Sequence, residues 1–178
     1  NFREFIGLAS MTDGDNKPDS NYALTTMLFS EKNLKSKMQV GFKGNPNIGS
    51  VVLNQFSQSD EFRDFASQMK DGDRIFIISS IFGGTGASGF PLLLKKLRSI
   101  DSKMAGSAAV RDSVIGAVTV MPYFDIEQSE TSEINSATFI SKTKAALAYY
   151  DRNVHEANAL YYIGDRSLGT PYKNSEGG

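Results

Sequence analysis

Residues 74–82, RIFIISSIF, constrain the fold of this chain more than any other stretch, because they contain four isoleucines in nine residues. Successive side chains of a strand point to opposite faces of a sheet, and here both faces would be apolar. Such a run is typical of a central strand that is covered on both sides, as in a parallel α/β sheet. Residues 113–122 are a second buried strand of this kind, and 159–165 form a strand that ends in a turn.

Strand-like and helix-like segments alternate along the whole chain. The expected strands are 4–10, 38–42, 74–82, 113–122 and 159–165, and the expected helices are 22–37, part of 51–72, 92–101 with Pro91 near its start, and 134–153. This order predicts an α/β fold, a mostly parallel sheet with helices on both faces, within a single domain over 1–178. The loops that begin at Gly44, Gly83, Pro122 and Gly164 follow carboxyl ends of strands, so we expect them on one rim, where such sheets bind ligands.

Composition narrows the class of protein. The net charge is −1 with scattered lysines and arginines, which argues against nucleic acid as a partner. The chain has no cysteine and no apolar run long enough for a membrane span. We expect no signal peptide and a cytoplasmic protein. His155 and the group Lys95, Lys96 and Arg98 are interpreted as solvated residues. Because the sequence starts with Asn1 and stops within a loop-like segment, we expect a piece of a longer chain.

A glycine loop, FGGTGASG at 82–89, lies between the central strand and a helix. Glycines allow the backbone to approach an anion closely, and the free amides of the helix's first turn point at it. Gly83, Gly84, Thr85, Gly86 and Ser88 are therefore the candidate phosphate-binding residues, although a tight structural turn would use the same glycines.

Two well-known glycine loops fit this stretch incompletely. A P-loop has Lys and Ser or Thr where this chain has Phe90 and Pro91, so that assignment fails. The dinucleotide pattern G-x-G-x-x-G is matched by Gly84, Gly86 and Gly89. That motif also needs an acid at the end of the next strand, about 20 residues later, whereas here the next strand ends over 30 residues later and the first acid after it is Asp125. A dinucleotide-binding (NAD) oxidoreductase domain remains an alternative.

The same loop resembles the signature G-G-G-T-G-[ST]-G of tubulin and its bacterial relative FtsZ. Residues 83–86 (GGTG) match in place, and Pro91 falls where FtsZ-like chains carry a proline. Phe82 replaces the first glycine, and residues 87–88 depart from the last two positions.

A second loop of the family faces the terminal phosphate, and residues 41–50, GFKGNPNIGS, resemble it. Gly44, Asn45, Pro46 and Gly49 match its pattern G-A-N-P-E-[IV]-G. The resemblance implies that Gly44, Asn45 and Pro46 meet the terminal phosphate, with Mg²⁺ neutralising charge there.

Two later segments continue the resemblance in the right order, so that it covers about residues 38–168. Residues 114–124 resemble the family strand that ends in V-V-T-K-P-F, which implies that Glu127 contacts the ribose, unless it is a solvated acid. Residues 161–168, YYIGDRSL, resemble I-P-N-D-R-I-L, which places Asp165 at the ribose and base. Gly164 replaces the asparagine that reads guanine, so guanine and other bases both stay open, and the altered glycine loop indicates a divergent bacterial or phage member.

The resemblance implies a Rossmann-like nucleotide-binding domain of tubulin/FtsZ type, incomplete at both ends. We expect it to bind GTP or GDP with Gly83–Gly86 and Ser88 on the α- and β-phosphates, and to self-associate. In the family, a neighbouring subunit supplies the acidic loop for hydrolysis, so no catalytic residue is expected in this chain. The open alternative is a tubulin-like module that binds nucleotide, or only assembles, without hydrolysis.

Overall fold

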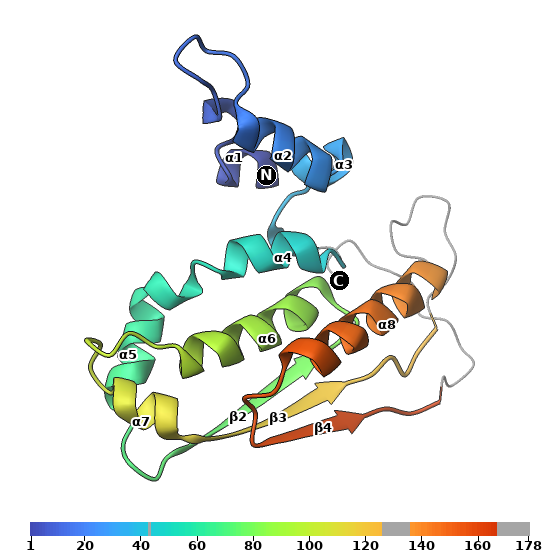
Figure 1. Ribbon diagram of the computed structural model, residues 1–178. Helices are drawn as coiled ribbons and strands as arrows, with labels where there is room; N and C mark the ends of the chain where they lie inside the picture. The colour runs from blue at the N-terminus through green and yellow to red at the C-terminus, as the bar shows by residue number, and fades with distance from the viewer. Residues whose placement is uncertain (43, 126–135, 167–178) are drawn as a thin grey trace.

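A computed structural model describes residues 1–42, 44–125 and 136–166, and its centre is an open parallel sheet (Figure 1). Three strands lie in the order β2-β3-β4, with Ile77 beside Ala117 and Ala117 beside Leu160. These strands are β2 (Arg74–Ser80), β3 (Val114–Val120) and β4 (Ala159–Ile163). Three predicted strands are thus confirmed, because apolar and β-branched runs suit a pleated, buried surface.

Both crossovers place their helices on the same face of this sheet (Figure 1). The chain runs from β2 through α6 (Gly84–Arg98) and α7 (Ser107–Asp112) to β3, and then through α8 (Ser136–Asn153) to β4. Crossovers between parallel strands are nearly always right-handed, so two that step in the same direction put their helices on one side.

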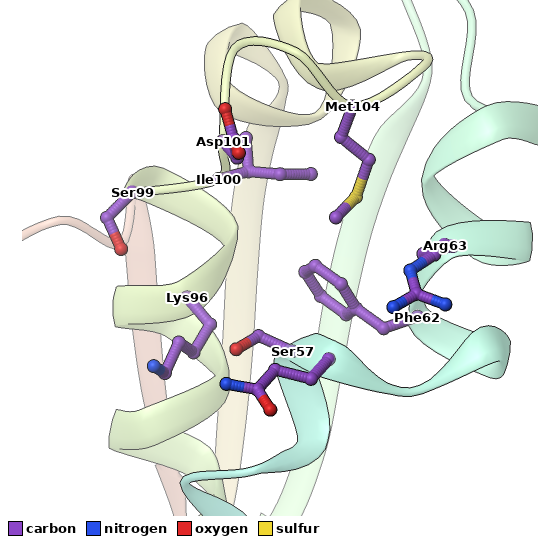
Figure 2. Close-up of a pocket in the computed structure, with 9 residues that line it drawn as sticks. Ser57, Phe62, Arg63, Lys96, Ser99, Ile100, Asp101 and Met104 are labelled. Atoms are coloured by element: carbon purple, nitrogen blue, oxygen red, sulfur yellow. The ribbon is translucent and has the colours of Figure 1, made fainter.

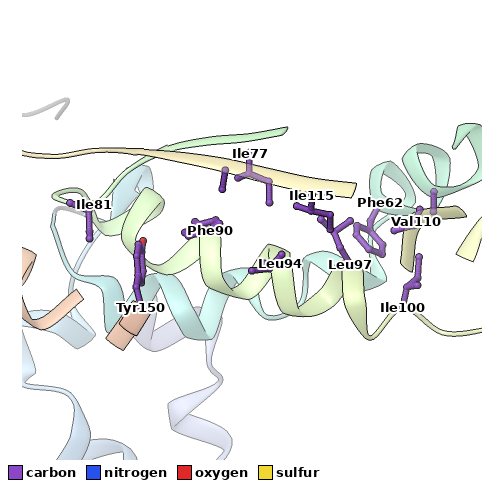
Figure 3. Packing of buried hydrophobic residues seen from close by; sticks show 12 residues of the cluster. Phe62, Ile77, Ile81, Phe90, Leu94, Leu97, Ile100, Val110, Ile115 and Tyr150 are labelled. Carbon is purple, nitrogen blue, oxygen red and sulfur yellow. The ribbon is translucent and has the colours of Figure 1, made fainter. Parts of the chain in front are cut away.

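The main core fills the space between these helices and the sheet (Figure 3). Phe90, Leu94 and Leu97 recur at helical spacing on α6 and pack with Ile77 and Ile115. Burial of each such side chain stabilises the fold by about 1.5–3 kcal/mol.

The opposite face of the sheet departs from the prediction of helices on both faces. Phe76, Ile78, Tyr161 and Ile163 are 56%, 74%, 58% and 58% exposed. Phe76 and Ile78 alternate with Ile75 and Ile77, which pack in the core, and no described helix covers the second face of the strands. The apolar sequence of these strands therefore did not predict which face is covered.

The N-terminal part is helical and packs on the outer side of α4 (Figure 1). Residues 4–10, predicted as a strand, instead contain the end of one short helix, a turn at residues 6–7 and a second short helix. The predicted helix 22–37 is broken at Phe29 and Ser30. Asn1 caps the first helix by a capping box, and the Ser30 hydroxyl caps α3, which explains both local outcomes. The elements are α1 (Phe2–Phe5), η1 (Leu8–Ser10), α2 (Ser20–Leu28), α3 (Glu31–Leu34), β1 (Gln39–Phe42), α4 (Pro46–Leu53), η2 (Phe56–Gln58) and α5 (Asp60–Gln68).

Pro91 lies in the interior of α6, not near its start as predicted. Proline has no N–H, so the carbonyl of Ala87, four residues earlier, loses its helical donor. The buried Tyr150 hydroxyl of α8 lies 3.2 Å from this carbonyl and donates to it. Burial raises the pKa of the Tyr150 phenol well above its usual range, so the donor stays protonated.

Arg98 has a structural role, in contrast to its interpretation as a solvated residue. Its guanidinium donates to the carbonyls of Glu156, Arg111 and Ser113 and to Asn158 Oδ1, at 2.6–3.1 Å. It therefore ties the end of α6 to the segments that precede β3 and β4.

Candidate functional site

The glycine loop forms the N-terminus of α6, directly after β2. Residues 81–83 are a bend, Gly83 is the N-cap, and no side chain caps the helix. The amides of the first turn have no acceptor within a helix, and they carry its positive dipole end. The amides of Gly84, Thr85 and Gly86 are thus oriented as in helix termini that bind anions.

Close packing requires two of these glycines independently of any ligand. A Cβ on Gly84 would lie 2.9 Å from Asn45 N and from Phe42 Cβ. On Gly86 it would lie in steric conflict with the carbonyl oxygen of Ser80 in β2. The glycines therefore let the start of α6 lie directly on β2 and on the β1–α4 loop.

The second predicted loop is shorter than expected, because α4 begins at Pro46 rather than after residue 50. Gly44 adopts φ +67°, Asn45 is the N-cap, and Pro46 fills the first turn, where its missing N–H costs nothing. Gly49 sits against the Ser88 hydroxyl and the Gly84 carbonyl of α6. The N-termini of α4 and α6 therefore lie side by side, and the two predicted phosphate loops meet.

Lys142 of α8 reaches the same place and was not predicted. Its Nζ donates to the Gly44 carbonyl over 2.6 Å and lies 3.5 Å from Asn45 Oδ1. The available signal was a lysine next to the apolar stripe of α8, whose buried members include Phe139, Thr143 and Tyr150. Long side chains at such positions cover apolar surface while their charge reaches a polar site.

Ser88, predicted as a phosphate-binding residue, does not present its hydroxyl to an anion. Its side chain is 3% exposed, and its hydroxyl donates to the Gly84 carbonyl at 2.7 Å inside α6. Thr85, by contrast, is exposed, and its hydroxyl would lie 3.4 Å from a Cβ on Gly41. Thr85 is therefore the hydroxyl of this loop that a ligand can reach.

Phe82, which departs from the glycine signature, belongs to an aromatic cluster beside the loop. Its ring centroid is 5.3 Å from that of Phe124, 5.4 Å from Phe139 and 6.4 Å from Tyr123. These rings join β2, β3 and α8 next to Gly83, so the phenylalanine holds the loop where a glycine could not.

The predicted rim is confirmed by contacts between successive loops. Asn45 adjoins Gly84, Phe82 contacts Tyr123, and a Cβ on Gly164 would lie 3.0 Å from Met121 Cβ. Asp165 is exposed on this rim, and its carboxylate accepts from the Arg166 amide. No described contact joins Asp165 to the glycine loop, and Glu127 lies outside the described residues.

A cavity of about 390 Å³ lies away from this rim, by the C-terminal end of α6 (Figure 2). Phe62, Ile100 and Met104 contribute apolar surface to it, with Arg63 and Lys96. Arg63 is already paired with Asp60. This hollow is thus separate from the two phosphate loops.

No protein-family model matches this chain, and comparison with curated proteins and with solved structures found no significant similarity. Within the part of the chain that the structure describes, no helix is long and apolar enough to cross a bilayer. Nor do three acidic or histidine side chains gather there in a way that could hold a metal ion.

Proposed function

We propose that this protein binds a nucleoside triphosphate, GTP, at the N-terminus of α6, as a divergent tubulin/FtsZ-like protein. The backbone amides of residues 83–86 and the hydroxyl of Thr85 would hold the α- and β-phosphates. Residues 44–46 would face the terminal phosphate. The observation that supports this most is the convergence of two helix N-termini and a lysine at the carboxyl edge of a parallel sheet.

Each part of the site would act by charge and position. Two helix N-termini each supply about half a positive charge, and Lys142 adds a full one. The glycines bring backbone donors close to the phosphates, and the Thr85 hydroxyl adds one more donor. Hydrolysis and filament assembly would depend on a neighbouring subunit, and Mg²⁺, when bound, would neutralise phosphate charge.

The packing of the third glycine favours this proposal over a dinucleotide site. In the dinucleotide motif, the last glycine permits close packing of the helix on its strand. Here a Cβ on Gly89 would lie 3.3 Å from Leu53 of α4, and it is Gly86 that contacts β2. The sequence therefore matches the pattern G-x-G-x-x-G, but its third glycine does not pack against the strand as it does in the dinucleotide motif.

The proposal is tested by titrating the protein with GTP and, separately, with NADH. We expect GTP to bind, and Thr85→Val to weaken it about tenfold, since hydrogen bonds to charged groups contribute about 1.5–3 kcal/mol. Thr26→Val, the same change on α2, should leave the affinity unchanged. Tight binding of NADH with none of GTP would refute the proposal.

A further inference from the structure

The role of Lys142 at this site rests on the proposed function. Lys142 is half-buried on α8, yet its ammonium group extends to the β1–α4 loop rather than into solvent. This contact joins residues 98 apart in sequence, so the fold itself places the charge there.

The position of the ammonium group within the loop identifies what it could bind. Gly44 and Asn45, which this ammonium group contacts, directly precede the first turn of α4. Asn45 also adjoins Gly84, the first residue of α6. The charge thus lies where the two helix N-termini meet, on the side of the β1–α4 loop.

The described residues of the two loops carry no charged side chain, and Lys43 of the β1–α4 loop lies outside the described residues. Residues 44–49 and 82–89 contain no lysine, arginine, aspartate or glutamate. A triphosphate carries several negative charges, which two partial helix charges offset only in part. A lysine is a compact point charge on a flexible stem with three donors, and this suits a phosphate that comes and goes.

We propose that Lys142 binds the terminal phosphate and makes the site prefer a nucleoside triphosphate to a diphosphate. Its ammonium group exchanges the Gly44 carbonyl for a phosphate oxygen when the triphosphate is bound. A charged acceptor makes a stronger hydrogen bond than a neutral carbonyl, which favours this exchange. With a diphosphate, the lysine keeps its contact with Gly44 and contributes little to binding.

The test compares GTP and GDP affinities of the wild type, Lys142→Met and Lys142→Arg, with Lys144→Met as the matched control. Lys144 is exposed on the same helix. We expect Lys142→Met to weaken GTP binding about 10- to 100-fold and GDP binding less than about threefold. Lys142→Arg should keep most of the preference for GTP, and Lys144→Met should match the wild type.

The ratio of the two affinities separates phosphate binding from a structural role. If Lys142 only anchored the loop, Lys142→Met would weaken GTP and GDP equally, and that result would overturn the inference. An unchanged GTP affinity would overturn it as well. In either case the wild type would still bind GTP, so the proposed function would stand. A wild type that binds neither nucleotide refutes both.

Discussion

Replacing Gly86 by alanine is expected to lower the free energy of unfolding by about 3 kcal/mol, at the upper end of the usual cost of overpacking. The added Cβ would overlap the carbonyl oxygen of Ser80 and approach its amide. Both atoms belong to the backbone of β2 and cannot rotate away, so α6 would have to move off the sheet. Urea unfolding followed by circular dichroism measures the change.

Gly83→Ala is the matched control within the same loop. Its Cβ would lie 3.6 Å from Ser80 Oγ, an ordinary contact, and Gly83 has φ −94°, which alanine adopts freely. We expect a cost below about 1 kcal/mol, the loss of a favourable N-cap residue. Equal effects of the two substitutions would mean that α6 does not start against β2 as described.

Removing one hydroxyl group, in Tyr150→Phe, is expected to cost about 1–3 kcal/mol. The phenylalanine ring keeps the edge-on contact with Phe90, whose centroid is 5.2 Å away. What is lost is the donor to the Ala87 carbonyl, which Pro91 leaves without its helical partner. The buried carbonyl would then be unsatisfied, and thermal or urea unfolding would report the loss.

Pro91→Ala tests whether the Tyr150 hydroxyl compensates for the donor that the proline lacks. Alanine restores an N–H at residue 91, which can donate to the Ala87 carbonyl within the helix. In that background we expect Tyr150→Phe to cost about 1 kcal/mol less than in the wild type, a coupling typical of groups that share a partner. An identical cost in both backgrounds would show that the hydroxyl does not compensate for the proline.

The strands were predictable because their chemistry is local. Residues 74–80, 114–120 and 159–163 lie within the predicted ranges, since apolar runs rich in β-branched residues suit buried strands. The carboxyl ends of these strands predicted the rim, and they also predicted that the two glycine-containing loops lie next to each other there. This much of the candidate site followed from topology.

The errors arose where tertiary contacts or capping decided the outcome. Residues 4–10 contain a strand-like apolar pattern, but Asn1 and Glu4 cap a helix there. Pro91 predicted a helix start, whereas Tyr150, 59 positions later, lets the helix continue through it. Ser88 was chosen for its hydroxyl, which α6 itself binds.

Lys142 could not be found from motif spacing at all. It follows the glycine loop by more than 50 residues, and only the crossover of α8 brings it to Gly44. The exposure of the second face of the sheet could not be predicted from the sequence either, because the strand sequences are apolar on both sides. Sequence thus predicted the three strands of the described sheet, wrongly added residues 4–10, and missed which distant groups complete its surroundings.

The most direct test of the central claim is an NMR titration of glycine-¹⁵N-labelled protein with GTP. The chain has 16 glycines, and phosphate binding at the start of α6 predicts that the amides of Gly83, Gly84, Gly86 and Gly44 shift most, with saturating dependence on GTP. Gly7, Gly72 and Gly106, which are remote from both loops in the chain, should stay in place. Shifts confined to those glycines, or none at all at saturating GTP, would contradict phosphate binding at the start of α6.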